Sequence, residues 1–361
     1  MKKKYSAIFA HEMRYVCWFL IAGMIISMLG VGYCWLHIHL ATDITLDNYM
    51  YSQGSVIVCN IVEFLKVMQT GLFLGISILT VVQFYEQKVK TTSEFLGSLP
   101  LKRVYTLWIK YVSGILTITL PILVFMVGSV GIFQYYINDI LKESLSNPYF
   151  DFIYANESIE NLLLNIGMFW LSAIVLYSIY FLTQIIVNPC LIAGFVGMAA
   201  ALAPAYLIRQ FDLLFVSFRG YAEETHKLFE IFLPWFGNSL GNNLVPSFEG
   251  ELTEHYVYRG FNVVTFSDLF PKFLCLISIW LFSMILIAIL YRRQNFTDGR
   301  FITSSVLEHL FVGCISVCAA MFLAVFSNEG RFSFLVSLII MIIVAVLTGM
   351  IVRQAIRRYY S

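Results

Sequence analysis

Residues 86–114 read EQKVKTTSEFLGSLPLKRVYTLWIKYVSG, a short polar connection between two long apolar runs. Its charge is mainly basic, from Lys88, Lys90, Lys102 and Arg103. An apolar turn, Phe95-Leu96, lies in its middle, where a solvated loop needs none. A short helix with an apolar face, held between two membrane spans, is suited to docking on a soluble partner. The segment therefore favours a membrane subunit that works with a second protein over a self-contained enzyme.

The composition of the whole chain agrees with a membrane protein. Of its 361 residues, 59% are hydrophobic and only 12% are charged, whereas about 25% of residues are charged in soluble domains. Apolar runs of about 18 or more residues, long enough for a helix to cross a bilayer, recur along the chain. We therefore expect an all-α integral membrane protein with eight transmembrane helices, at residues 16–36, 56–84, 107–133, 161–186, 190–208, 273–291, 309–326 and 332–352.

Charge predicts which side each end of the chain occupies. An even number of spans returns the chain to the side where it began, and Lys and Arg are enriched on the cytoplasmic side of membrane proteins. The segments assigned to that side carry Lys2, Lys3, Lys4, Arg14, Lys88, Lys90, Lys102, Arg103, Arg292, Arg293, Arg300, Arg353, Arg357 and Arg358. The same segments hold few acids, namely Glu12, Glu86, Glu94, Asp298 and Glu308. Both termini are therefore predicted to be cytoplasmic.

The segments outside the spans divide the chain further. Residues 1–15 are basic and mildly amphipathic, so they predict an interfacial helix before the first span; a plain positively charged anchor is the alternative. Residues 85–106, 292–308 and 353–361 are the other cytoplasmic parts. Residues 209–272 form a large outer segment, in which 228–241 contain aromatic residues broken by Pro and Gly. That pattern favours short re-entrant or interfacial helices, or a packed lid.

Local signals inside the cytoplasmic connection predict its shape. Ser93 and the two threonines before it can cap a helix, and Glu94 suits the first helical turn. Gly97 and Pro100 would then end it. So short a helix gains little stability alone and needs something to pack against. An ordinary ordered loop is the alternative.

Motifs for chemistry are weak in this chain. No G-x-x-x-x-G-K-[ST] phosphate loop occurs, so nucleotide hydrolysis by that route requires another polypeptide. The sequence HEMRY at His11 is a near miss to a zinc-protease motif, because its second ligand position is Tyr15. We expect no catalytic residue, no metal site and no cofactor in this chain. The seven cysteines fall in or beside apolar runs and suit packing.

A few polar and small residues in the spans are candidates for function. Glu63 and Lys66 are three residues apart on one helix face and could pair at the outer interface or line a pathway. Gln69, Gln134, Asn165 and Gln184 could line a pathway or join helices, and joining helices is the default. Gly194, Gly197 and the alanines that follow give the fifth span a small-residue surface, a candidate subunit interface.

Residues 93–114, SEFLGSLPLKRVYTLWIKYVSG, resemble the coupling helix, SLP–basic turn and third span of the membrane subunits of bacterial ABC exporters of the second, ABCG-like architecture. The basic start at residues 1–15, the outer segment between spans five and six, and YRRQNFTDGR at residues 291–300 agree with this likeness. Six spans cover the core of that family, and two C-terminal spans are an addition.

The resemblance implies a permease subunit, not an enzyme, in a bacterial cytoplasmic membrane. It implies two permeases, identical or paired with a sister chain, over separately encoded ABC ATPase subunits that bind ATP and Mg, with lipid around them and no nucleic acid. The residues implied in ATPase coupling are Glu94, Phe95, Leu96, Leu99, Lys102 and Arg103. Those implied in a pathway or outer gate are Glu63, Lys66, Gln69, Phe232, Trp235 and Phe236. Export of an amphipathic peptide, an antibiotic or a lipid-like substrate is expected.

Two other functions fit the same sequence. An integral-membrane enzyme acting on a lipid-linked substrate needs catalytic groups clustered at one depth, and the chain offers no convincing set. A non-transporting subunit that senses a peptide, or gives immunity to it, would share the fold and the partner of a permease.

Overall fold

A computed structural model describes residues 2–42, 57–88, 103–144, 158–219, 246–248, 258–261, 266–293, 301–302, 304–327 and 334–360. The helices are α1 (Lys2–Thr42), α3 (Ile57–Lys88), α5 (Arg103–Ser144), α7 (Ile159–Ile186), α8 (Cys190–Arg219), α10 (Phe266–Arg293), α11 (Ser305–Ser327) and α12 (Phe334–Tyr360). All eight are long and apolar enough to cross a membrane. The predicted all-α fold with eight spans is confirmed, and the chain is a multi-pass membrane protein.

The outer segment contains a feature that the sequence did not predict. Strands β1 (Pro246–Phe248) and β2 (Tyr258–Phe261) pair antiparallel between α8 and α10. The segment at residues 228–241, for which short helices or a lid were expected, lies outside the described residues.

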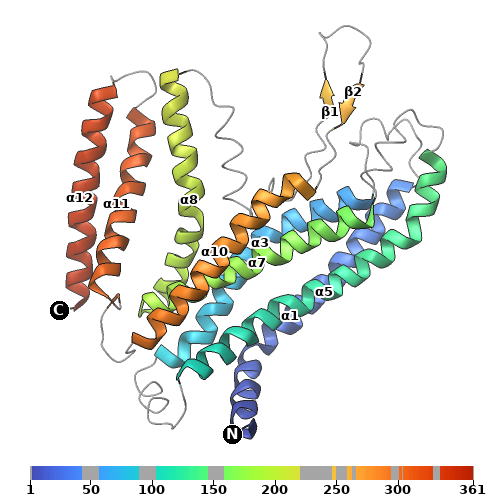
Figure 1. Ribbon diagram of the computed structural model, residues 1–361, viewed down its shortest axis with the longest axis horizontal. Helices are drawn as coiled ribbons and strands as arrows, with labels where there is room; N and C mark the ends of the chain where they lie inside the picture. The colour runs from blue at the N-terminus through green and yellow to red at the C-terminus, as the bar shows by residue number, and fades with distance from the viewer. Residues whose placement is uncertain are drawn as a thin grey trace.

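The helices form two groups that meet at α7 and α8 (Figure 1). Helices α1, α3, α5, α7 and α10 run obliquely together, with α1 packed along α5 and with α7 in contact with α3, α5 and α10. Helix α8 packs on α3 and α7, α11 packs on α8, and α12 packs on α11. Helix α7 is the most buried span and α12 the least. The chain is thus a helical core with a peripheral α11–α12 hairpin.

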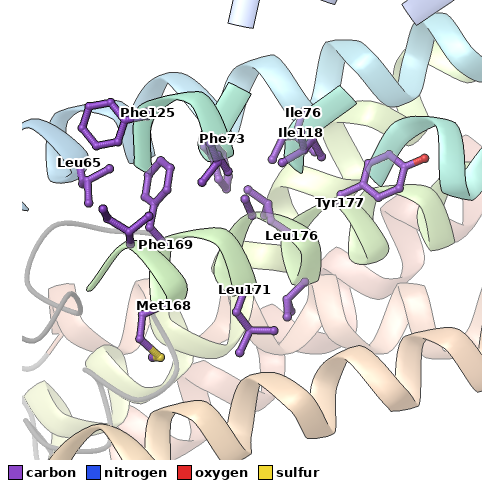
Figure 2. Packing of buried hydrophobic residues seen from close by; sticks show 14 of the residues in the cluster. Leu65, Phe73, Ile76, Ile118, Phe125, Met168, Phe169, Leu171, Leu176 and Tyr177 are labelled. Carbon is purple, nitrogen blue, oxygen red and sulfur yellow. The ribbon is translucent and has the colours of Figure 1, made fainter. Parts of the chain in front are cut away.

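The core lies where α3, α5 and α7 meet. Apolar side chains from these three helices interdigitate along α7 (Figure 2), which removes its surface from lipid. The labelled members are Leu65, Phe73, Ile76, Ile118, Phe125, Met168, Phe169, Leu171, Leu176 and Tyr177. Ser158 caps the start of α7, because its hydroxyl accepts the Asn161 N–H at 3.1 Å.

Several helices extend past the apolar runs that predict them. Residues 2–15 are helical and form the first part of the continuous helix α1 (Lys2–Thr42), and their position at the membrane interface stays a prediction. Helix α5 was expected at 107–133 and covers Arg103–Ser144, and α8 reaches Arg219 instead of residue 208. A helix satisfies its own backbone in water as well as in lipid, so its end need not coincide with the end of the apolar run.

One face of small residues on α8 packs inside this chain. Ala193, Gly197, Ala201 and Ala205 recur every four residues, and all four are buried. A Cβ added at Gly197 would lie 2.7 Å from Tyr180 Cδ1 on α7. Gly194 contacts α3 in the same way, with Val81 Cγ2 at 2.7 Å. Gly194 and Gly197 therefore let α8 approach α3 and α7 and are not free for a subunit interface. Ala199 and Ala200 are exposed, and for them the predicted interface stays a prediction.

Candidate functional site

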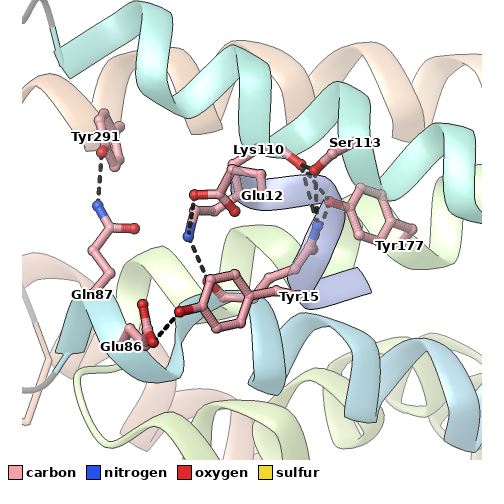
Figure 3. Close-up of polar contacts among 9 residues, drawn as sticks. Glu12, Tyr15, Glu86, Gln87, Lys110, Ser113, Tyr177 and Tyr291 are labelled. Carbon is pink, nitrogen blue, oxygen red and sulfur yellow. Dashed lines mark hydrogen bonds and ion pairs between the residues drawn. The ribbon is translucent and has the colours of Figure 1, made fainter. Parts of the chain in front are cut away.

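A buried ion pair joins α1 to α5 near the start of each helix. Lys110 Nζ lies 3.3 Å from Glu12 Oε1, and the two residues expose only 6% and 8% of their surface. We call this end of the bundle, which holds the start of α1 and the residue 89–102 connection, the inner end. Charges withdrawn from water are costly unless they are paired. The pair therefore fixes α1 against α5 at this end (Figure 3).

Hydrogen bonds link Lys110 to α3, and link α3 in turn to α7. The Lys110 ammonium donates to the backbone oxygen of Gln83. The Gln83 amide donates to the Lys110 carbonyl and to Ser113 Oγ, both at 3.3 Å. The fully buried Tyr177 hydroxyl donates to Gln83 Oε1 at 2.9 Å. Gly114 makes room for this phenol, because a Cβ at position 114 would overlap the Tyr177 ring.

Further hydrogen bonds extend the same layer to α1 and α10. Tyr15 donates to the Glu86 carboxylate, and Gln87 donates to Tyr291 Oη on α10 at 2.9 Å (Figure 3). Deeper in the bundle, Trp280 on α10 donates to Tyr111 Oη at 3.0 Å. Tyr111 in turn lies 2.6 Å from Ser178 Oγ on α7. Every helix of the oblique group thus takes part.

Lys88, the last residue of α3, is held by the turn between α7 and α8. Its ammonium donates to Gln184 Oε1 at 2.8 Å and to the Val187 carbonyl at 2.7 Å. Two lysine side chains also lie over the ring of Phe84, with Lys88 Nζ 5.7 Å and Lys110 Nζ 5.2 Å from its centroid. The two carbonyl oxygens accept two of the three hydrogen bonds that the Lys88 side chain can donate.

The α7–α8 turn, which holds Lys88, also contacts the residues just before α11. Gln184 Nε2 donates to the Cys190 carbonyl at 3.1 Å, which shapes the turn. The Asn188 N–H donates to the Phe301 carbonyl at 3.0 Å, and Val187 forms an antiparallel bridge with Ile302. The segment that leads into α11 is therefore tied to the turn that holds the end of α3.

We define the inner polar cluster as Glu12, Gln83, Lys88, Lys110, Tyr177 and Gln184. Its members brace α3 and α5 on both flanks of the connection at residues 89–102. Within the described ranges, no group of three or more His, Cys, Asp or Glu residues is placed to hold a metal ion. The arrangement is suited to fixing the relative positions of helices.

Most residues predicted to couple to an ATPase lie outside the described residues. These are Glu94, Phe95, Leu96, Leu99 and Lys102. Arg103 is the first residue of α5, but its side chain is not among those described. The predicted outer-gate aromatics, Phe232, Trp235 and Phe236, also lie outside.

The other predicted pathway residues are described and lie on α3, and their role in a pathway stays a prediction. Glu63 is exposed, Lys66 is half-buried and Gln69 is buried. The expected ion pair between Glu63 and Lys66 is not formed, because Glu12–Lys110 is the one ion pair among the described residues. Among the polar residues of the spans, Gln184 joins two helices, because its Oε1 on α7 accepts from Lys88 on α3. Joining helices is the role that the sequence analysis favours for these residues.

Sequence reasoning missed Lys110 and the buried role of Glu12. The signal was present, since Lys110 lies three residues inside the predicted span at 107–133, and ionisable groups at membrane depth are often functional. Its partner, Glu12, contributes to the sequence analysis only as one acid of the N-terminal segment.

Comparisons of the chain with protein-family models, with curated proteins and with solved structures find no match.

Proposed function

We propose that this chain is the membrane permease subunit of an ATP-driven exporter in a bacterial cytoplasmic membrane. In this proposal, residues 89–102 dock on a separately encoded ABC ATPase that binds ATP and Mg, and a second permease completes the pathway. An amphipathic peptide, an antibiotic or a lipid-like molecule is the proposed substrate. The chain itself does no chemistry.

The observation that supports the proposal most directly is the bracing of α3 and α5 around residues 89–102. A force applied to a short connection moves helices as a unit only if the two helix ends beside it are held together. Lys110 joins the start of α5 to Glu12 and to the end of α3, and Lys88 joins that end to the α7–α8 turn. A push on the connection would therefore reach α1, α7 and α8.

The magnitudes are adequate for this role. Switching a two-state pathway from 1:99 to 99:1 requires a differential binding free energy of about 5.5 kcal/mol, which ATP would supply through the partner. An exposed ion pair contributes only about 0–1 kcal/mol, so it would break before the pathway switched. Separating a buried pair leaves two uncompensated charges away from water, which costs several kcal/mol, and each added hydrogen bond contributes about 1 kcal/mol. The inner polar cluster can thus transmit the load.

Charge reversal in the connection tests the proposal. Glu94→Lys and Arg103→Glu should leave the protein folded in membranes while reducing transport-coupled ATPase activity of the assembled complex at least tenfold. Arg209→Glu is the matched control, since it reverses an exposed charge on α8 away from the connection, and it should retain activity. Unchanged ATPase activity in both Glu94→Lys and Arg103→Glu would overturn the docking role.

A further inference from the structure

The inner end of the α11–α12 hairpin holds an arginine fixed by a histidine. Arg353 Nη2 lies 3.1 Å from His309 Nε2, and His309 Nδ1 lies 2.7 Å from the Ser305 carbonyl. A carbonyl only accepts and a guanidinium only donates. The ring therefore carries its proton on Nδ1, and Nε2 accepts from Arg353. The histidine positions the guanidinium without neutralising its charge.

A second arginine lies one helical turn further along the same face. Arg353 and Arg357 are four residues apart on α12 and both are exposed. The nearest acid in the sequence of α11, Glu308, forms no ion pair with either, since the one ion pair of the described residues is Glu12–Lys110. Two positive charges thus share one exposed face without an acidic partner in the described parts of the chain.

The same face continues into the membrane as an apolar stripe. Ile339, Ile342, Val346 and Met350 precede the two arginines at spacings of three or four residues, and each exposes more than half of its surface. At about 1.5 Å per residue, Phe334 lies about 28 Å from Arg353 and about 34 Å from Arg357 along the helix. Arg353 and Arg357 therefore follow the apolar stripe at the C-terminal end of the helix, about one and two turns beyond Met350.

We propose that Arg353 and Arg357 bind the phosphate of an anionic phospholipid in the inner leaflet, with one acyl chain along the stripe from Ile339 to Met350. The paired guanidinium groups match phosphate oxygens, and basic groups at the inner ends of transmembrane helices attract anionic lipid. The apolar stripe selects a lipid over free phosphate, because a soluble ion has nothing to place on it. This site is independent of the proposed transport role.

Native mass spectrometry of the full-length protein in detergent tests the site. We would titrate phosphatidylglycerol and phosphatidylcholine with identical acyl chains, and inorganic phosphate as a competitor. Wild-type protein should retain phosphatidylglycerol in preference to phosphatidylcholine. Arg353→Gln and Arg357→Gln should each weaken its retention about fivefold, which corresponds to the roughly 1 kcal/mol that a basic residue contributes near an anionic surface. Arg14→Gln removes one exposed inner charge from α1 and should change nothing.

A further variant separates positioning from charge. His309→Ala keeps both arginines but removes the acceptor that fixes Arg353, so it should weaken retention about twofold, and His309→Gln should restore it. Equal retention of the two lipids by wild type, an unaffected Arg353→Gln/Arg357→Gln double variant, or an equal loss in Arg14→Gln would each overturn the proposal. Full displacement of the lipid by millimolar inorganic phosphate would do so too, because it would identify a phosphate site instead of a lipid site.

Discussion

Lys110 Nζ on α5 lies 3.3 Å from Glu12 Oε1 on α1, and both side chains are withdrawn from solvent. The same ammonium donates to the end of α3, so a single cation joins α1 to α3 and α5, the two helices that border the connection at residues 89–102. Because the cation and its acid are buried together, neither can be lost without leaving the other uncompensated. This relationship makes the inner polar cluster testable one residue at a time.

Lys110→Met should destabilise the protein strongly, since it leaves the Glu12 carboxylate buried and unpaired. The expected cost is about 3–5 kcal/mol, seen as a large fall in the melting temperature in detergent and in the yield of monodisperse protein. The double variant Glu12→Gln/Lys110→Met should be more stable than Lys110→Met, because it removes both charges. A double variant that loses the sum of the two single effects would contradict the buried pair.

Two glycines on α5 should respond to alanine in opposite directions. Gly114→Ala puts a Cβ against the buried Tyr177 phenol, so we expect a loss of about 1–3 kcal/mol from overpacking. Gly131→Ala meets nothing within 4 Å and should gain about 1 kcal/mol from helix propensity. Melting temperatures of the two variants measure the difference, and equal shifts would contradict the packing of α5 on α7.

Lys88→Met should loosen the α7–α8 turn without unfolding the bundle. The Lys88 ammonium donates to Gln184 and Val187, and hydrogen bonds from a charged group contribute about 1.5–3 kcal/mol each. Amide exchange at Asn188 should therefore accelerate about tenfold, which needs only about 1.4 kcal/mol. Hydrogen–deuterium exchange with mass spectrometry checks this, with Lys66→Met as the control on the same helix. Equal exchange in Lys88→Met and wild type would show that the turn does not depend on Lys88.

A large side chain on the buried small-residue face of α8 should impair folding. The same change in a subunit interface would impair assembly instead. Gly197→Leu should prevent close contact of α8 with α7 and lower the melting temperature by several degrees. Ala200→Leu, on the exposed side of the same helix, should leave it nearly unchanged. If Gly197→Leu altered oligomeric state alone, with the melting temperature of wild type, the inward placement of this face would be wrong.

The eight helices could be predicted from sequence because each has an apolar run long enough to span, and hydropathy is a local property. Their ends were less predictable, as α5 shows by extending past both predicted limits to Arg103 and Ser144. Polar residues beyond the bilayer continue a helix at little cost, so hydropathy loses its signal there. The β1–β2 hairpin was missed for a related reason, since short strands outside the membrane carry no span signal.

The inner polar cluster was less predictable than the fold, because it depends on which helices touch. Lys110 stood out only as a charge within a span, while Glu12 is 98 positions earlier in the chain (110 − 12 = 98). No spacing rule connects residues on different helices. Glu63 and Lys66 show the opposite error: their spacing on one helix suggested a pair, yet Glu63 points to the exposed surface. Spacing along one helix therefore shows which residues could pair, but it does not show that they do.

The most direct test of the proposed permease role is a mild-detergent pull-down of the tagged protein from its native membranes, with partners identified by mass. We expect a stoichiometric subunit that carries a G-x-x-x-x-G-K-[ST] phosphate loop, and we expect it to be lost when residues 94–99 are replaced. A chain that is recovered alone or only with copies of itself, under conditions that preserve other membrane complexes, would contradict the account.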